Sequence, residues 1–225
     1  MLRLIAPFTD DVVQFPYEQA VLSKYRLRGL GGKRKQVRLG LTGASYRWAT
    51  MSRHAERLTL SLTLPFEERE DVDEEADLFG LFVNAVSAVD CLLYAAYTLA
   101  SIRRRAQFPM ETEGHYKQIA PVPMARLFTE QYPDHRLTLE LVALSVSPSY
   151  DRMRTARNHL AHRAGIPRLE HYARTERWMT WGLQKGEEVR LTPAYVHAVH
   201  QLATARMWRL MCGIDAFTDE YFESR

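Results

Sequence analysis

The chain has 225 residues and a mass of 26.1 kDa, which suits one globular domain with at most a sizeable extension. Hydrophobic residues make up 46% and charged residues 25%, and this ordinary globular mix excludes a disordered or collagen-like chain. The two cysteines, Cys91 and Cys212, lie in apolar stretches, which excludes a disulfide scaffold and a cysteine-rich zinc module. A reducing, cytoplasmic setting is therefore expected.

The net charge of +3 is ordinary, but the charge is distributed unevenly along the chain. From Met1 to Leu60 eleven Lys and Arg stand against four acids, and from Ser61 to Asp90 nine acids stand against a single Arg. The basic excess peaks between Lys24 and Arg38, in a glycine-rich stretch. Such a segment could follow a phosphate backbone or form a solvated loop. The candidate RNA-binding residues in it are Lys33, Arg34 and Lys35.

The first third of the sequence predicts a mixed, partly β extension. Residues Leu58–Leu64 alternate strictly between leucine and a polar residue, which indicates a strand. The glycines between Gly29 and Gly43 indicate loops or hairpin connections, with a short strand over Val37–Leu41. We therefore expect residues 1–66 to form a basic N-terminal extension of strands and loops, and residues 67–225 to form a helical domain.

A long helix is predicted from about Glu68 to Ala106. Acids gather at its start and arginines at its end, which complements the helix macrodipole. Its apolar residues cover more than one face, so the helix should be central and buried. Asn84 and Asp90 lie near the middle of its apolar stretch. Because an intramembrane carboxylate is costly, no membrane association is expected.

The rest of the chain predicts shorter helices and one hairpin. The shorter helices are expected at about Pro123–Gln131, His135–Ser145 and Pro148–Arg163. An apolar–polar alternation over Thr175–Leu191 predicts a small β hairpin. Thr192 should cap a last helix that has Pro193 in its first position and extends to about Phe217. The predicted fold is mainly α, an antiparallel helical bundle with small β additions.

The first candidate for a catalytic site is the segment Asp151–Arg163, in which four residues separate Arg157 from His162. That spacing alone carries little weight, because a chain with 25 arginines and eight histidines contains several such pairs by chance. The position of this pair on a predicted helix strengthens the case for a site. At about 100° per residue, Arg154, Asn158 and His162 share one helix face, so Asn158 can orient the His162 ring.

The two end residues of this motif have the properties that metal-free RNA cleavage needs. His162 falls in the last helical turn, where the negative end of the dipole favours the imidazolium and raises the pKa of the ring. Arg157 flanks the same face and can neutralise the charge of a phosphorane, while a histidine transfers the proton.

At these residues the chain resembles the HEPN superfamily, helical domains named for nucleotide binding in higher eukaryotes and prokaryotes. The family signature is R-x4-6-H with a polar residue, often Asn, directly after the Arg. Arg157, Asn158 and His162 match it, and Ala161 is the usual small residue before the histidine. The resemblance covers the predicted helical region and leaves the first 65 residues uncovered. Members of the toxin branch carry a Tyr two positions after the His, whereas this chain has Ala164, so that branch is not expected.

The resemblance implies a metal-independent endoribonuclease without a cofactor, acting as a homodimer in which two motif helices form one composite site. His162 would take the proton from a ribose 2′-hydroxyl or protonate the leaving 5′-oxygen. Arg157 would hold the phosphate and Asn158 would orient the histidine, with Arg154 and His159 as supporting or RNA-binding residues. The products would be a 2′,3′-cyclic phosphate and a 5′-hydroxyl. The implied setting is prokaryotic defence, antiviral defence included, or stress, with a regulatory protein partner.

Two alternatives to catalysis stay open. Arg157 and His162 could satisfy carbonyls at the helix end, or pair with Asp151 or Glu170, which would leave a catalytically silent HEPN-like dimer. Such a module would bind RNA, a nucleotide or a protein partner. An unrelated helical adaptor is the third interpretation.

A metal site is a further alternative, and the sequence argues against it. His159 and His162, like His197 and His200, are spaced i, i+3 and could present two imidazoles to a metal ion. Neither pair has an accompanying Glu at ligand spacing, and no HExxH motif is present. We therefore expect no metal ligands.

Overall fold

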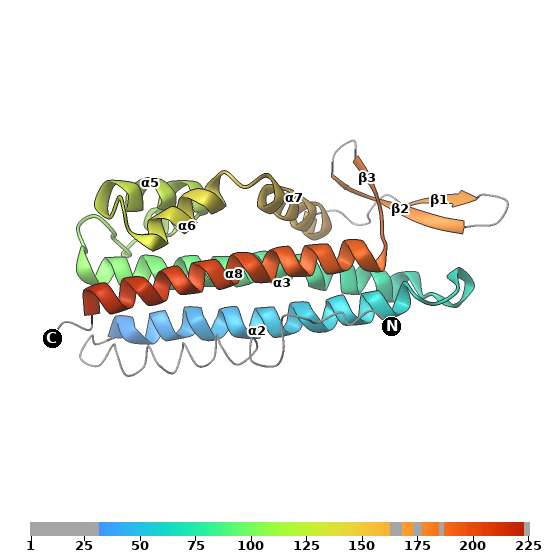
Figure 1. The fold of residues 1–225 in the computed structure, drawn as a ribbon, viewed down its shortest axis with the longest axis horizontal. Coiled ribbons are helices and arrows are strands. Elements are labelled where there is room, and N and C mark those ends of the chain that lie inside the picture. The colour runs from blue at the N-terminus through green and yellow to red at the C-terminus, as the bar shows by residue number, and fades with distance from the viewer. Residues whose placement is uncertain (1–31, 163–167, 173–176, 185–186, 223–225) are drawn as a thin grey trace. The chain divides into compact units, whose positions relative to one another are not determined.

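The computed structural model describes residues 32–162, 168–172, 177–184 and 187–222, and this part of the chain is mainly α, as predicted (Figure 1). A single 3-10 turn, Phe66–Glu68, precedes the second of its long helices. The α-helices are α2 (Gly32–Ser61), α3 (Asp71–Arg103), α4 (Glu113–Tyr116), α5 (Pro121–Gln131), α6 (Arg136–Ser145), α7 (Pro148–His162) and α8 (Pro193–Phe222).

Helix α2 replaces the strands predicted before Pro65, so the prediction of a partly β extension is wrong for Gly32–Ser61. Leu58 and Leu62 are 0% and 8% exposed, whereas Leu60 and Leu64 are 60% and 43% exposed. A strand would place all four leucines on one face, but a helix separates them, because residues four apart share a side. Leu62 continues this helical turn, since its N–H donates to the Leu58 carbonyl at 3.0 Å. The alternating pattern therefore fits a helix as well as a strand, because Leu58 and Leu62, four residues apart, lie on the same side of a helix.

The glycines of α2 permit a close helix–helix contact, and the predicted loop and short strand around them are also wrong. A Cβ atom added to Gly40 would lie 2.8 Å from the carbonyl oxygen of Cys91 and 3.0 Å from the Cβ of Ala95 in α3. One added to Gly43 would lie 3.0 Å from the Cys91 Sγ. Glycine is therefore needed here for the approach of two backbones and not for a turn.

The chain forms two compact units, and α2, α3 and α8 each contribute to both. Unit 1 comprises Met1–Arg47, Ser87–Ser147 and Ala205–Arg225, and unit 2 comprises Trp48–Val86 and Pro148–Thr204. The predicted boundary between residues 66 and 67 stays a prediction.

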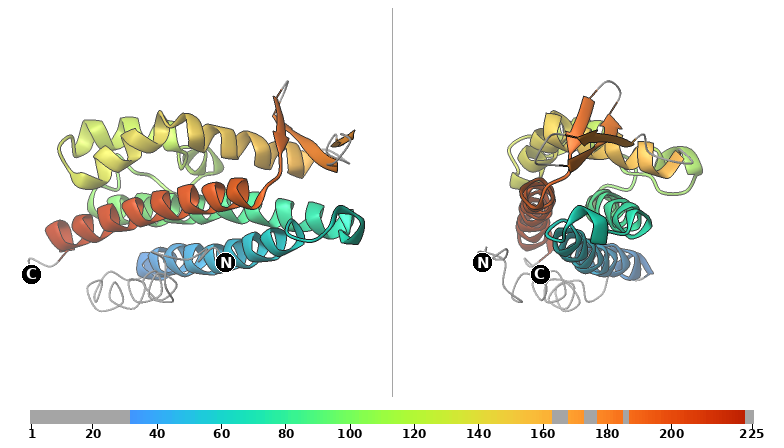
Figure 2. Two further views of the ribbon diagram at one scale, coloured as in Figure 1. Left: turned by 45° about the vertical axis from the view of Figure 1, so that its right-hand side comes forward. Right: turned by 90° about the vertical axis from the view of Figure 1, so that its right-hand side faces the viewer.

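Unit 1 has an aromatic core around Phe128. Its ring centroid lies 5.1 Å from that of Phe108 and 6.0 Å from that of Phe217, and Phe217 in turn packs edge-on against Tyr132 at 4.9 Å. These rings come from α5, α8 and the segment after α3, so they join parts of the unit that are distant in sequence. Helices α5 and α6 lie side by side in both views of Figure 2.

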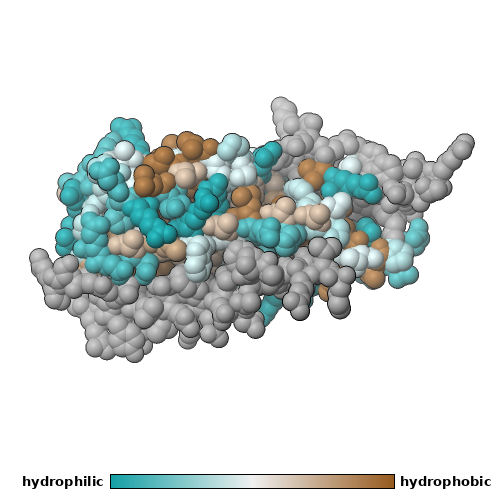
Figure 3. Space-filling model, in the orientation of Figure 1, coloured by the Kyte–Doolittle hydropathy of each residue, from teal (hydrophilic) through white to brown (hydrophobic). Residues whose placement is uncertain are grey.

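An apolar strip lies exposed on α5 and α6 in unit 1. The space-filling view shows a brown area over these two helices (Figure 3). Its exposed residues are Val122, Leu139, Val142 and Val146. Leu139, Val142 and Val146 follow the i, i+3, i+7 spacing of one helix face.

Unit 2 holds the three-stranded antiparallel sheet, in which β1 (Arg168–Tyr172), β2 (Arg177–Gln184) and β3 (Glu187–Arg190) are neighbours in sequence order. The predicted hairpin corresponds to β2 and β3, and β1 adds a third strand. Helix α7 contacts β2. The start of α8 is confirmed, because the Thr192 hydroxyl accepts a hydrogen bond from the Tyr195 N–H at 3.1 Å.

Helix α3 confirms the predicted long central helix. Its segment Val72–Arg103 is long and apolar enough to cross a membrane by length and composition alone. In the most apolar window of that segment 67% is buried within the protein, and the core helix of a globular protein has the same character.

Candidate functional site

The buried side of α7 anchors the candidate site. Met153, Ala156 and Leu160 follow the i, i+3, i+7 spacing, and all three are buried. Tyr150, in the first turn, is buried as well. These residues hold one side of α7 against unit 2, so the other side is left for polar residues.

The predicted motif residues lie on that other side. Arg154, Asn158 and His162 follow the i, i+4, i+8 spacing, and the centre of their face is about 160° from the centre of the buried side at 3.6 residues per turn. Asn158 is exposed and Arg154 is half-buried. His162 is the last residue of α7, and its side chain lies outside the described part of the structure. The helix therefore brings the three predicted positions onto one face, away from the core.

Arg157 lies at the edge of the buried side, about 40° from Met153 at 3.6 residues per turn, and is half-buried. Within the described residues, no hydrogen bond or ion pair engages the side chain of Arg154, Arg157 or Asn158. The alternative pairing of Arg157 with Asp151 is therefore not formed, while the Glu170 side chain lies outside the described residues. An arginine without a partner keeps all five of its N–H donors for a phosphate.

His159 differs from its neighbours on α7. Its side chain is half-buried, and its Nδ1 atom is buried without a hydrogen-bond partner in the described part of the chain. Its position lies about 100° beyond Asn158 at 3.6 residues per turn, so it is not on the motif face. His159 therefore points about 100° away from Asn158, although its position is spaced i, i+3 from that of His162.

The predicted basic residues of α2 belong to unit 1, whereas the motif belongs to unit 2. Lys33 Nζ donates a hydrogen bond to Ser101 Oγ at 2.7 Å, Arg34 is half-buried and Lys35 is exposed. These three residues lie on a helix and not on the expected loop. The remainder of the predicted basic segment, residues 24–31, lies outside the described residues.

The sequence did not predict a polar cluster that joins α2 to α3 in unit 2. The buried carboxylate of Asp77 accepts from His54 Nδ1 at 2.9 Å and pairs with Arg57 Nε at 3.3 Å. The face of the His54 ring lies against Gly80, where a Cβ atom would meet Cδ2, Nε2 and Cε1. This histidine is therefore held by a carboxylate at Nδ1 and by the α3 backbone against its ring face, and its contacts are those of a structural residue.

A second unpredicted cluster joins α2 to α8 in unit 2. Trp48 Nε1 donates to Thr204 Oγ1 at 3.0 Å, and Ser52 Oγ lies 2.9 Å from His200 Nε2. Burial lowers the pKa of His200 to about 4, with a smaller contribution from the charge of His197. His200 is therefore neutral near pH 7 and its Nε2 is occupied. Among the described residues no three His, Cys, Asp or Glu side chains gather as metal ligands.

No sequence signal identifies these two clusters, because each joins helices that are far apart in the chain. Asp77 and His54 are 23 residues apart, and Ser52 and His200 are 148 apart. Comparison of the chain with protein-family models, curated proteins and solved structures finds no match. The candidate site therefore depends on the residues of α7 themselves.

Proposed function

We propose that this protein is a HEPN-type, metal-independent endoribonuclease whose site lies on the motif face of α7. The supporting observation is that Asn158 is exposed, Arg157 is half-buried, and neither side chain has a partner among the described residues. His162 follows one turn later, as the last residue of the helix. A half-buried guanidinium without a partner keeps its N–H donors for a phosphate, which favours an anionic ligand.

The chemistry uses only groups of this chain and of the RNA. His162 takes the proton from a ribose 2′-hydroxyl, and the oxygen attacks the adjacent phosphorus. Arg157 stabilises the charge that develops on the phosphoryl oxygens. The bond to the 5′-oxygen breaks and that oxygen receives a proton from the protonated second His162 of the composite site, which leaves a 2′,3′-cyclic phosphate and a 5′-hydroxyl. Asn158 orients the imidazole, and Arg154, one turn earlier on the same face, adds positive charge.

The site is composite in this proposal. Two copies of α7 meet in a homodimer, and each supplies an Arg157 and a His162 to one RNA-binding cleft. The enzyme acts in the cytoplasm of a prokaryotic cell, in antiviral defence or in stress, under the control of a protein partner.

The test is RNA cleavage in EDTA by purified protein. His162→Ala should lower the rate by about 10²-fold or more, the usual contribution of a general acid or base. Arg157→Ala should lower it comparably through lost charge stabilisation. Arg152→Ala is the matched control, because Arg152 is exposed on the same helix about 140° from Arg157. His159→Ala is the second control, since it lies off the motif face.

Several outcomes would contradict this assignment. They are loss of wild-type cleavage in EDTA, cleavage of DNA, which lacks the 2′-hydroxyl, and a His159 variant more impaired than the His162 variant. Light scattering that shows a monomer at micromolar concentration would contradict the composite site. RNA binding without any cleavage would favour the catalytically silent HEPN-like module instead.

A further inference from the structure

Two segments that are distant in sequence place cations at one end of unit 1. Helix α2 starts here in the described structure and α3 ends here, and the hydrogen bond from Lys33 Nζ to Ser101 Oγ at 2.7 Å joins them. We call this cluster the basic end. It consists of Lys33, Lys35, Arg38, Arg103, Arg104 and Arg105.

Few of these charges are compensated within the described residues. Arg105 Nε pairs with Glu111 Oε1 at 2.9 Å, which neutralises one cation. Arg104 Nη1 donates to the neutral amide of Gln131 at 2.7 Å, and Lys33 donates to a neutral hydroxyl. The three others, Lys35, Arg38 and Arg103, are exposed and have no acidic partner there.

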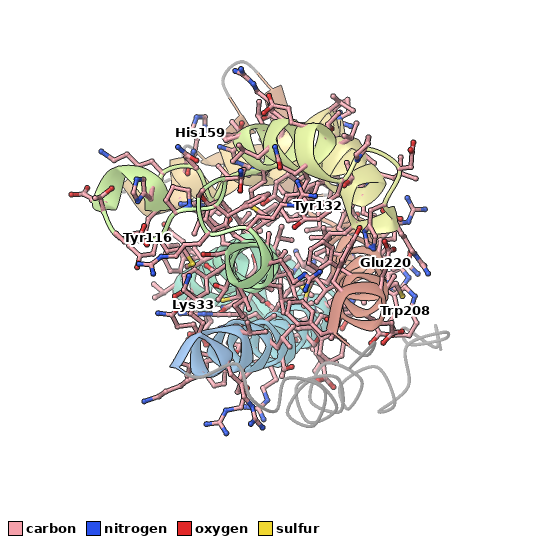
Figure 4. All side chains as sticks on the ribbon, turned by 90° about the vertical axis from the view of Figure 1, so that its left-hand side faces the viewer. Lys33, Tyr116, Tyr132, His159, Trp208 and Glu220 are labelled. Atoms are coloured by element: carbon pink, nitrogen blue, oxygen red, sulfur yellow. The ribbon has the colours of Figure 1, made fainter. Side chains whose placement is uncertain are left out.

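Glu220, the acid that precedes Tyr221 in α8, does not offset this charge. Glu220 lies 3.5 Å from His135 Nε2 and hydrogen-bonds to Tyr221, so its contacts are not with the arginines. Figure 4 looks onto this end of unit 1 and labels Lys33 beside α2 and Glu220 on α8. Five cations without an acidic partner among the described residues raise the local positive potential and attract a polyanion.

Two arginines of the basic end are stacked on aromatic rings. The Arg103 guanidinium lies 5.7 Å from the ring centroid of Tyr221 and 5.9 Å from that of Phe222, and Arg104 lies 5.1 Å from that of Tyr132. Stacking engages the face of a guanidinium and leaves the N–H donors in its plane. The Arg103 side chain makes no hydrogen bond within the described residues, so its planar fork is available to a phosphate.

We propose that the basic end binds the phosphate backbone of single-stranded RNA, and that the ring of Phe222 offers its remaining face to a base. Arginines interleaved with half-buried aromatic rings are the combination that single-stranded nucleic acid requires, a charged track with stacking surfaces beside it. This inference rests on the proposed function, which makes RNA the substrate. It adds an anchoring surface in unit 1, built from α3 and α8 as well as from α2.

The test is fluorescence anisotropy with a labelled single-stranded oligouridylate over a series of salt concentrations. All proteins carry His162→Ala, so that the RNA is not consumed. Combining Lys35→Gln, Arg38→Gln and Arg103→Gln removes three candidate phosphate contacts. The log–log salt slope should then fall by about 2, at about 0.7 per contact for a single strand, and the Kd should rise about tenfold or more at low salt.

The matched control removes three other exposed cations of unit 1, through Lys117→Gln, Arg126→Gln and Arg209→Gln. Because the net charge changes equally, the control should leave affinity and slope near those of the parent. Equal weakening of both triple variants would overturn the proposal, since only overall charge would then matter. Absence of RNA binding by the parent protein would overturn it as well. So would the finding that the parent protein binds phosphatidylserine vesicles and not RNA, and that the triple variant loses this vesicle binding.

Failure of this inference is distinguishable from failure of the proposed function. If wild-type protein does not cleave RNA but the basic end governs RNA binding, the nuclease assignment fails and the binding surface stands. If wild-type protein cleaves RNA, and protein with the three Gln substitutions but intact His162 cleaves it equally well with unchanged affinity, the binding surface fails and the nuclease assignment stands.

Discussion

Substitution of Gly80 by alanine should destabilise the protein, although alanine favours helices over glycine. A Cβ atom at position 80 would lie 2.4 Å from Cδ2 and Nε2 of the His54 ring and 2.5 Å from Cε1. Real contacts of this kind are never so short, so the ring must leave its place. His54 Nδ1 would then lose its 2.9 Å hydrogen bond to Asp77, whose buried carboxylate would keep Arg57 as its remaining partner.

The magnitude follows from two opposing contributions. A hydrogen bond to a charged group contributes about 1.5–3 kcal/mol, and its loss destabilises the folded state by that amount. Alanine in place of glycine within a helix stabilises by about 1 kcal/mol. The free energy of unfolding should therefore fall by about 0.5–2 kcal/mol. Guanidinium unfolding followed by circular dichroism measures this change.

Gly80→Ala should change the free energy of unfolding in the opposite direction when His54 is absent. In a His54→Ala background the ring that obstructs the new methyl group is gone, so Gly80→Ala should raise the free energy of unfolding by about 1 kcal/mol. The coupling energy between the two sites is then about 1.5–3 kcal/mol. An equal change in the two backgrounds would refute the steric link between Gly80, His54 and Asp77.

Two further predictions concern the helix contacts. Gly40→Ala should lower the free energy of unfolding by about 1–3 kcal/mol, because its Cβ would lie 2.8 Å from the Cys91 backbone oxygen, which cannot rotate away; unchanged stability in the same unfolding assay would contradict this. His200 should titrate by NMR with a pKa of about 4. An unfolded histidine has a pKa of about 6.5, so the folded state should lose stability as the pH falls from about 6.5 towards 4. His200→Gln should reduce that loss, and a ring that titrates near 6.5 would count against burial as the cause.

Sequence patterns predicted the elements whose signals are local. Helix α8 starts where a capping Thr192 and a following proline indicate, and α3 extends between its acidic start and its arginine-rich end. Helix α2 was missed because its signals are ambiguous without the partner helix. Leu58 and Leu62 have the spacing of a strand and of a helix alike, and Gly40 has no visible reason until the Cys91 backbone lies against it.

The same distinction between local and distant signals applies to the candidate sites. The motif face of α7 was predictable, because helical spacing alone relates Arg154 to Asn158 and His162. The basic end was predictable only in its α2 half. Its other half required the contact of Lys33 with Ser101 and of Arg103 with Tyr221, which are 68 and 118 residues apart.

The pairing of polar groups separates residues that hold the fold from residues that are free to act on a ligand. Asp77 is buried with two partners and His200 is held by Ser52, so a substrate would have to displace existing bonds to use either one. Arg157 has no such bond among the described residues, and neither has Arg103. Because a buried polar group without a partner is costly while a solvated one is not, unpaired arginines at the surface can be retained for a ligand at little cost in stability. In the proposed function the surface on α7 acts on a bond of the RNA, and in the further inference the basic end anchors the same polyanion.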